Sequence, residues 1–166
     1  MGFVGKGGKN IGNKKIIEME KRIKSINQNC NITKINEFIN NDNINIIFQN
    51  QIDYLIDACD SIFTKQLLIS KCIEKKIKII SCMGTGNKID PTKLEIIDIR
   101  KTSYDPLAKK IRKYVNDNKI KEKIPVVYSK EKNKKFKGSI PSMIFVPSTA
   151  GILCANFVIR DIINNQ

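Results

Sequence analysis

Two carboxylates follow a short apolar run in the first half of the chain. The run at residues 54–56 leads directly into Asp57-Ala58-Cys59-Asp60, which places Asp57 and Asp60 three residues apart. Ligands of open α/β sheets bind beyond the carboxyl ends of the strands, where a carboxylate can hold Mg²⁺ or a ribose hydroxyl. These residues therefore form a candidate nucleotide or magnesium site. The alternative is that Asp60 only caps the helix that follows.

Glycines mark two further candidate segments. The loop Gly84-Thr85-Gly86 follows another apolar run, at residues 77–82, and its glycines would let the backbone approach a ligand closely. The alternative is a plain turn, since a lone Gly-x-Gly is a weak signal. Near the start, residues 5–9 (Gly-Lys-Gly-Gly-Lys) match neither the Walker pattern nor Gly-x-Gly-x-x-Gly after a strand. We do not expect this N-terminal segment to bind phosphate.

Basic residues exceed acidic ones by a wide margin, and the formal net charge is +14. Such a charge indicates a polyanionic partner, either a nucleic acid or an anionic membrane surface. The alternative is a bias of composition, because Lys, Asn and Ile are abundant throughout the chain. The densest basic group is Lys109, Lys110, Arg112 and Lys113, on a helix expected after Asp105-Pro106. It is either a solvated helix face or a contact to nucleic-acid phosphates.

Histidine is absent, and the five cysteines are scattered. Without histidine the chain contains no Ser-His-Asp or Cys-His triad and no histidine-ligated metal. No two cysteines are spaced as Cys-x-x-Cys, which excludes a zinc site of that kind. The odd number and the scattered positions are typical of reduced thiols, so we expect a cytoplasmic protein.

The elements that would position these residues alternate between buried strands and helices. An unbroken apolar run at residues 54–56 predicts a strand buried on both faces, as in a parallel sheet, and residues 77–82 repeat that pattern. Further strands are expected at residues 94–99 and 126–129. Periodic apolar residues predict a helix at residues 12–27, and Ser61 and Asp105 are residue types that cap two further helices. A weaker strand is expected at residues 32–38.

The C-terminal region is the most apolar part of the chain. We expect a strand at residues 140–146 and a helix from Ser148 to Ile163. Polar residues and Pro147 interrupt the apolar stretch, which falls short of the roughly 20 residues that span a bilayer, so we predict a core helix and no membrane partner. At 166 residues the chain suffices for one α/β domain, with a parallel βαβ part, then mixed or antiparallel strands and a C-terminal helix.

Several segments, in this order, resemble the ThiF/MoeB/HesA family of adenylating enzymes. The first is residues 11–15 (IGNKK) with the helix after it, and the second is residues 54–65 (YLIDACDSIFTK). The third, residues 82–108 (CMGTGNKIDPTKLEIIDIRKTSYDPLA), is the most specific and looks like the tRNA threonylcarbamoyladenosine dehydratase branch. Residues 126–131 (VVYSKE) and 138–151 (GSIPSMIFVPSTAG) agree with that branch. The resemblance extends from residue 11 to the C-terminus.

The resemblance implies a site for ATP and Mg²⁺. Lys15 corresponds to a lysine that contacts the ATP phosphates, and Asp60 to the aspartate that holds Mg²⁺ and ATP; these two would carry catalysis. Asp57 and Lys65, in the same motif as Asp60, are expected at the nucleotide as well. On the substrate side, the residues that would shape the cleft are Gly84, Gly86, Asp90 and Asp105.

The reaction implied by the resemblance acts on tRNA. The threonine carboxylate of a tRNA adenosine beside the anticodon would be adenylated, and the carbamoyl group would then close a ring with loss of AMP. The basic helix residues Lys109, Lys110, Arg112 and Lys113 could follow tRNA phosphates. Because Asp105 stands where some relatives have Cys, we do not expect a thiol relay there.

One large part of the family pattern has no counterpart. The first strand, the Gly-rich turn and the Asn-x-x-Arg-Gln element belong before residue 11, and residues 1–10 do not resemble them. We therefore expect residues 11–166 to form an incomplete Rossmann-like ThiF-type domain of a truncated form, with weak ATP binding and an exposed sheet edge.

Two alternatives to a dehydratase stay open at this point. One is an inactive remnant that dimerises or binds tRNA. The other is a sulfur-carrier-activating relative, which predicts the zinc-binding cysteines that this chain lacks. For the dehydratase, the expected partners are tRNA, a second copy in a homodimer and a sulfur-transfer system protein.

Overall fold

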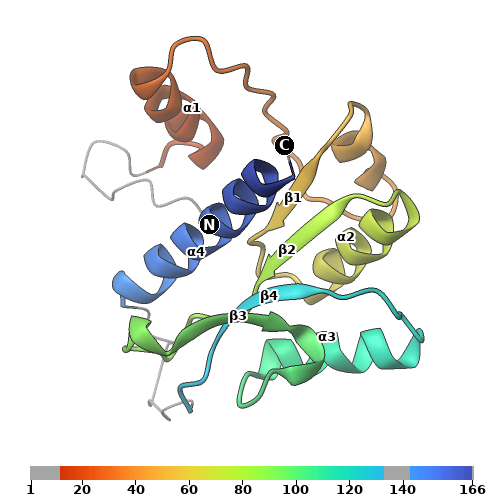
Figure 1. Ribbon diagram of the computed structural model, residues 1–166. Coiled ribbons are helices and arrows are strands. Elements are labelled where there is room, and N and C mark those ends of the chain that lie inside the picture. The colour runs from red at the N-terminus through yellow and green to blue at the C-terminus, as the bar shows by residue number, and fades with distance from the viewer. Residues whose placement is uncertain (1–11, 133–142, 166) are drawn as a thin grey trace. The chain divides into compact units, whose positions relative to one another are not determined.

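The computed structural model describes residues 12–132 and 143–165. They divide into an N-terminal unit that ends at Gln49 and a C-terminal unit that begins at Asn50. Figure 1 shows the strands, all of them in the C-terminal unit. The Gly-Lys-Gly-Gly-Lys segment at residues 5–9 lies outside the described residues, as do residues 133–142.

The N-terminal unit contains helix α1 (Lys15–Ile26) and a short 3₁₀ helix, η2 (Ile44–Phe48). The predicted helix at residues 12–27 is thereby confirmed. Glu18, in the first turn of α1, accepts hydrogen bonds from Asn13 Nδ2 at 3.1 Å and from Lys21 Nζ at 2.9 Å. A carboxylate in the first turn also interacts favourably with the helix dipole.

The strand predicted at residues 32–38 is wrong. This segment forms neither helix nor strand, and Phe38 is 76% exposed. A strand needs a neighbour for its backbone hydrogen bonds, and the described part of the N-terminal unit contains no strand that could supply them. Sequence propensity alone therefore did not produce a strand.

The C-terminal unit is built on a four-stranded mixed sheet. Its strands are β1 (Tyr54–Asp57), β2 (Lys78–Cys82), β3 (Leu94–Asp98) and β4 (Pro125–Ser129). They are arranged in the order β1-β2-β4-β3. Strands β1, β2 and β4 are parallel, and β3 pairs antiparallel with β4. The predicted parallel part followed by an antiparallel part is confirmed.

Helices cover both faces of this sheet. In Figure 1, α2 (Ile62–Glu74) and α3 (Pro106–Asp117) lie on one face and α4 (Phe145–Asn164) lies on the other. The two predicted caps are present: Ser61 Oγ accepts from Thr64 N at 3.2 Å, and Asp105 Oδ1 accepts from Ala108 N at 2.8 Å. Two short 3₁₀ helices flank β3, namely η3 (Pro91–Lys93) and η4 (Ile99–Lys101).

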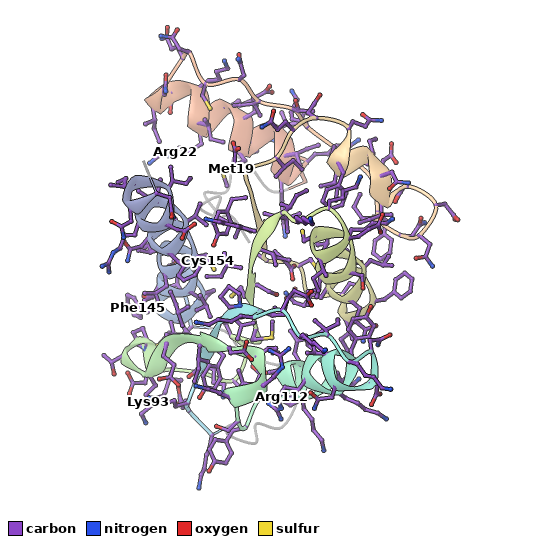
Figure 2. All side chains as sticks on the ribbon, turned by 45° about the vertical axis from the view of Figure 1, so that its right-hand side comes forward. Met19, Arg22, Lys93, Arg112, Phe145 and Cys154 are labelled. Atoms are coloured by element: carbon purple, nitrogen blue, oxygen red, sulfur yellow. The ribbon has the colours of Figure 1, made fainter. Side chains whose placement is uncertain are left out.

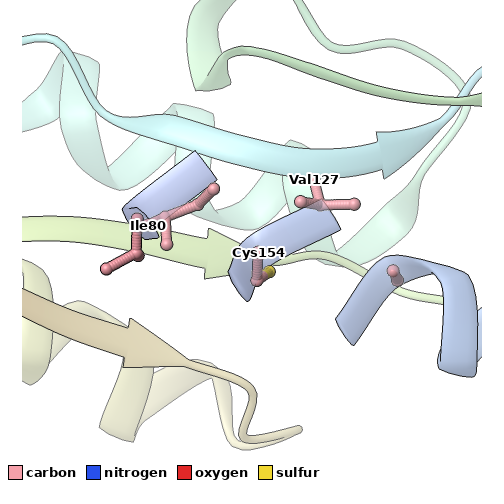
Figure 3. Packing of buried hydrophobic residues seen from close by; sticks show 5 residues of the cluster. Ile80, Val127 and Cys154 are labelled. Carbon is pink, nitrogen blue, oxygen red and sulfur yellow. The ribbon is translucent and has the colours of Figure 1, made fainter. Parts of the chain in front are cut away.

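One face of helix α4 packs into the core. Ala150, Cys154 and Val158 are buried against Ile80 of β2 and Val127 of β4 (Figure 3). Within the described residues, α4 is the one helix that by length and composition alone could cross a membrane. Its contacts with the sheet agree with the predicted core helix.

The strand predicted at residues 140–146 is wrong at its end, where Phe145 and Val146 already belong to α4; residues 140–142 lie outside the described residues. Pro147 stands in the first turn of this helix. The first backbone N–H groups of a helix have no partner within it, so a proline is tolerated there and does not delay the start of the helix.

Candidate functional site

The two carboxylates after β1 have opposite environments. Asp57 is 2% exposed, and its Oδ2 accepts from Lys65 Nζ at 2.9 Å and from Ser81 Oγ at 2.5 Å. Asp60 is exposed, and within the described residues its carboxylate has no hydrogen-bond or ionic partner. The helix cap is supplied by Ser61, so the alternative role of Asp60 as that cap is wrong. Asp60 is therefore the carboxylate that is open to a ligand.

Lys65 lies completely within the protein. Its Nζ donates to Asp57 Oδ2, to Ser81 Oγ at 3.2 Å and to the Cys82 carbonyl at 2.8 Å. An ammonium group has three donors, so all of them are used by the protein. Because Asp57 and Ser81 are neighbours in the register of β1 and β2, Lys65 joins α2 to the carboxyl ends of both strands.

The thiol in this turn is a weak nucleophile. Burial, followed by the neighbouring Asp57 carboxylate, raises the pKa of Cys59 to about 12. The reactive species of cysteine is the thiolate, and Cys59 is a neutral thiol at neutral pH. The raised pKa of Cys59 therefore argues against covalent chemistry at this position.

The structure places two of the predicted substrate residues, Gly84 and Asp105, close together. A Cβ added at Gly84 would lie 3.0 Å from Asp105 Oδ2. Asp105 is 3% exposed and holds the first turn of α3 through Ala108 N. The absence of a side chain at Gly84 thus allows the end of β2 to meet the start of α3. Gly86 lies in the same loop and is half-buried.

The fourth predicted substrate residue, Asp90, closes that loop. Its Oδ1 accepts from Thr92 N at 3.0 Å and from Thr92 Oγ1 at 2.6 Å, which lowers the pKa of the Asp90 carboxyl. The backbone N–H groups of Ile89 and Asp90 each donate to Glu131 Oε2 at 3.0 Å. Asp90 is therefore an ionised cap of η3, fixed to the end of β4.

Lys88 and Glu131 are structural partners that the sequence did not reveal. Lys88 is 1% exposed and its Nζ donates to the backbone carbonyl of Glu131. Burial lowers the pKa of Lys88, while the carboxylates of Asp105 and Glu131 act against that shift. Both residues stand inside the family-like motifs, but they are 43 positions apart, so no local pattern predicts their contact.

The basic residues of α3 fall into two groups. Lys109, Lys110 and Lys113 are exposed, and their spacing places them on one face of the helix. Arg112 is half-buried, and its Nη1 donates to Thr102 O at 2.8 Å and to Thr102 Oγ1 at 2.6 Å (Figure 2). The three lysines are free to meet a polyanion, whereas Arg112 holds the turn before the helix.

Lys15 is exposed at the first position of α1, in the N-terminal unit. All the other predicted site residues belong to the C-terminal unit. The described residues contain no group of three or more Cys, Asp or Glu side chains that could enclose a metal. Proteins commonly hold Mg²⁺ by one or two carboxylates together with substrate phosphates, and the single free carboxylate of Asp60 fits that mode.

Comparison with known proteins adds a family and several relatives. The sequence model of the ThiF family matches residues 7–104. The tRNA threonylcarbamoyladenosine dehydratase of Bacillus subtilis (strain 168) is 33% identical over 173 residues, covering 93% of this chain and 68% of the relative. The Escherichia coli (strain K12) protein of the same name is 34% identical over 153 residues, covering 88% and 53%. This chain therefore spans about two thirds of one relative and about half of the other.

Solved structures agree with these relatives. The crystal structure of E. coli tRNA N6-threonylcarbamoyladenosine dehydratase, TcdA, in complex with AMP has a TM-score of 0.87 and 30% sequence identity, covering 95% of this chain and 67% of that one. Its complex with ATP has the same TM-score and identity, covering 96% and 68%. The Rossmann-like, ThiF-type fold of this chain is thereby shown.

Proposed function

This chain belongs to the ThiF family, and on that premise we propose that it is an ATP-dependent tRNA threonylcarbamoyladenosine dehydratase. One observation carries the proposal. Nearly the whole chain superimposes on a dehydratase that was solved with both AMP and ATP. That dehydratase binds ATP, which the proposed reaction consumes, and AMP, which the reaction releases.

The proposed reaction has two steps. An oxygen of the threonine carboxylate attacks the α-phosphorus of ATP, and pyrophosphate leaves. The carbamoyl group then attacks the activated carbonyl carbon, and the ring closes as the C–O bond to AMP breaks. Adenylation supports ring closure because AMP is a far better leaving group than the oxygen of a free carboxylate.

Charge neutralisation is the task proposed for Asp60 and Lys15. Mg²⁺ would neutralise phosphate charge at this site, held by the exposed Asp60 carboxylate and the ATP phosphates. Lys15 is exposed at the start of α1 and would donate to the phosphates. The side chains of Asp57 and Lys65 form an ion pair with each other. We therefore propose that they act on the nucleotide indirectly, by fixing the turn that carries Asp60.

On the substrate side, Gly84, Gly86, Asp90 and Asp105 are proposed to shape the cleft for the modified adenosine. Support comes from the close approach of the loop at Gly84 to Asp105 at the start of α3. The exposed lysines of α3 are proposed to contact tRNA phosphates, with Arg112 in an indirect role. We also propose a cytoplasmic homodimer that cooperates with a sulfur-transfer protein.

Calorimetric titration with Mg²⁺-ATP tests the nucleotide site. We expect magnesium-dependent binding that is lost in Asp60→Ala and weakened in Lys15→Ala. Asp53→Ala is the matched control, because Asp53 is an exposed carboxylate just before β1. Unchanged affinity in Asp60→Ala would show that this residue is wrongly assigned. A folded chain that binds tRNA but no Mg²⁺-ATP would instead support a non-catalytic binding module.

A further inference from the structure

Tyr104 is an exposed aromatic residue on an otherwise anchored turn. Its side chain is 58% exposed, and its backbone φ of +55° lies in the left-handed region that non-glycine residues seldom adopt. Bulky residues keep such a conformation only where the surrounding structure imposes it. The turn therefore holds the Tyr104 ring at the surface.

The residues on both sides of Tyr104 impose this geometry. Thr102 is buried, donates through Oγ1 to the Ile99 carbonyl at 2.7 Å and accepts from Arg112 Nη1. Asp105 is buried at the start of α3, where it accepts from Ala108 N, and its carboxylate lies close to Gly84. Arg112 and Asp105 thus fix the turn before and after Tyr104, so the ring is presented with little loss of freedom when a ligand binds.

A cation accompanies the ring. Lys132 Nζ lies 5.3 Å from the centroid of Tyr104, within the range of a cation–π contact. Lys101 is exposed three residues before Tyr104, and α3 continues after it with the exposed residues Lys109, Lys110 and Lys113. A flat aromatic surface among cations fits a ligand that carries both aromatic rings and negative charge.

We propose that Tyr104 and Lys132 form a stacking site for an unpaired base of an RNA loop. The base stacks on the exposed ring, and the ammonium group of Lys132 pairs with an adjacent phosphate. Stacking of this kind is how proteins hold single-stranded nucleic acid, whereas paired RNA hides its base faces. The inference rests on the proposed function and adds an RNA contact outside the nucleotide site.

The position of Tyr104 relates the stacked base to the candidate substrate loop. Tyr104 directly precedes Asp105, and the Asp105 carboxylate lies close to Gly84, just after β2, since a Cβ added at Gly84 would be 3.0 Å from Asp105 Oδ2. A base stacked on Tyr104 would lie beside the loop proposed to hold the modified adenosine. Tyr104 is therefore assigned to a nucleotide that flanks that adenosine in the anticodon loop.

Binding of two RNA probes to the full chain tests this inference. One is a fluorescent hairpin with the sequence of an anticodon stem-loop, and the other is a fully paired duplex of equal length. We expect Tyr104→Ala to weaken hairpin binding by about tenfold and to leave duplex binding unchanged. Tyr104→Phe should keep the hairpin affinity, because the ring is retained. Lys132→Met should weaken the hairpin complex and reduce its salt dependence.

Phe63→Ala is the matched control, because Phe63 is 48% exposed on α2 of the same unit. Equal losses for hairpin and duplex in Tyr104→Ala would overturn the stacking site and leave only a charge effect. No RNA binding by the wild type, or Tyr104-dependent binding to phosphatidylserine vesicles instead, would overturn it as well. Mg²⁺-ATP titration of the same samples shows separately whether the proposed nucleotide site fails.

Discussion

Burial distinguishes two carboxylates that the sequence presents as a pair. Asp57 is neutralised by Lys65 inside the protein, while Asp60, three residues later, is exposed. The sequence could supply both as candidates because they follow an apolar run. It could not show which one is occupied, since Lys65 and Ser81 reach Asp57 from 8 and 24 positions away. The same reason hid Lys88 and Glu131.

Lys65→Met should lower the free energy of unfolding by about 3 to 5 kcal/mol, because it leaves the Asp57 carboxylate buried without a counter-ion. Urea unfolding followed by circular dichroism measures this loss. Lys71→Met is the matched control in α2, where Lys71 pairs with Glu74 at the surface and the expected change is at most about 1 kcal/mol. The double variant Lys65→Met/Asp57→Leu should recover part of the loss. Equal effects of Lys65→Met and Lys71→Met would contradict the account of the buried pair.

The sequence predicted those helices and strands whose signals lie within their own segment. The four strands of the sheet lie within segments that the sequence predicted as strands, and the caps of α2 and α3 are set by Ser61 and Asp105. The expected strand at residues 32–38 failed because a strand also depends on a neighbour, which local sequence does not specify. The early start of α4 was missed because residues 140–146 were expected to form a strand, whereas Phe145 and Val146 belong to the first turn of the helix, which also accepts Pro147.

Gly84→Ala should destabilise the junction between β2 and α3, since the new Cβ would lie 3.0 Å from Asp105 Oδ2. We expect a loss of about 1 kcal/mol or more in unfolding free energy, measured by urea titration. Gly151→Ala is the control, because a Cβ there meets nothing within 4 Å. Residue 151 lies in the middle of α4, where alanine stabilises a helix relative to glycine. That variant should gain about 0.5 to 1 kcal/mol. A neutral Gly84→Ala would show that the junction has room to relax.

At the scale of the molecule, the C-terminal unit has several large apolar side chains exposed on its surface. Strand β1 is at one edge of the sheet, and Ile56 is 46% exposed there. Phe145, Ile152 and Ile159 of α4 are 63%, 67% and 56% exposed, and they are spaced seven residues apart. A stripe with this repeat is typical of helices that pack against another helix. It supports the proposed association of two copies.

Light scattering after size exclusion tests this association. We expect the wild type to be dimeric or larger, and Ile152→Lys/Ile159→Lys to be smaller, because charged side chains would interrupt the stripe. Asn156→Lys adds a charge at an exposed polar position of the same helix and should leave the size unchanged. A monodisperse wild-type monomer with a cooperative melt would contradict the proposed homodimer.

The most direct test of the central claim is to incubate the chain with Mg²⁺-ATP and a tRNA that carries threonylcarbamoyladenosine. AMP is quantified by chromatography, and the tRNA nucleosides are examined by mass spectrometry. The account predicts AMP together with a nucleoside that has lost one water, and both products should disappear in Asp60→Ala and persist in Asp53→Ala. A folded wild-type chain that forms no AMP and leaves the nucleoside unchanged would contradict the proposed dehydratase activity.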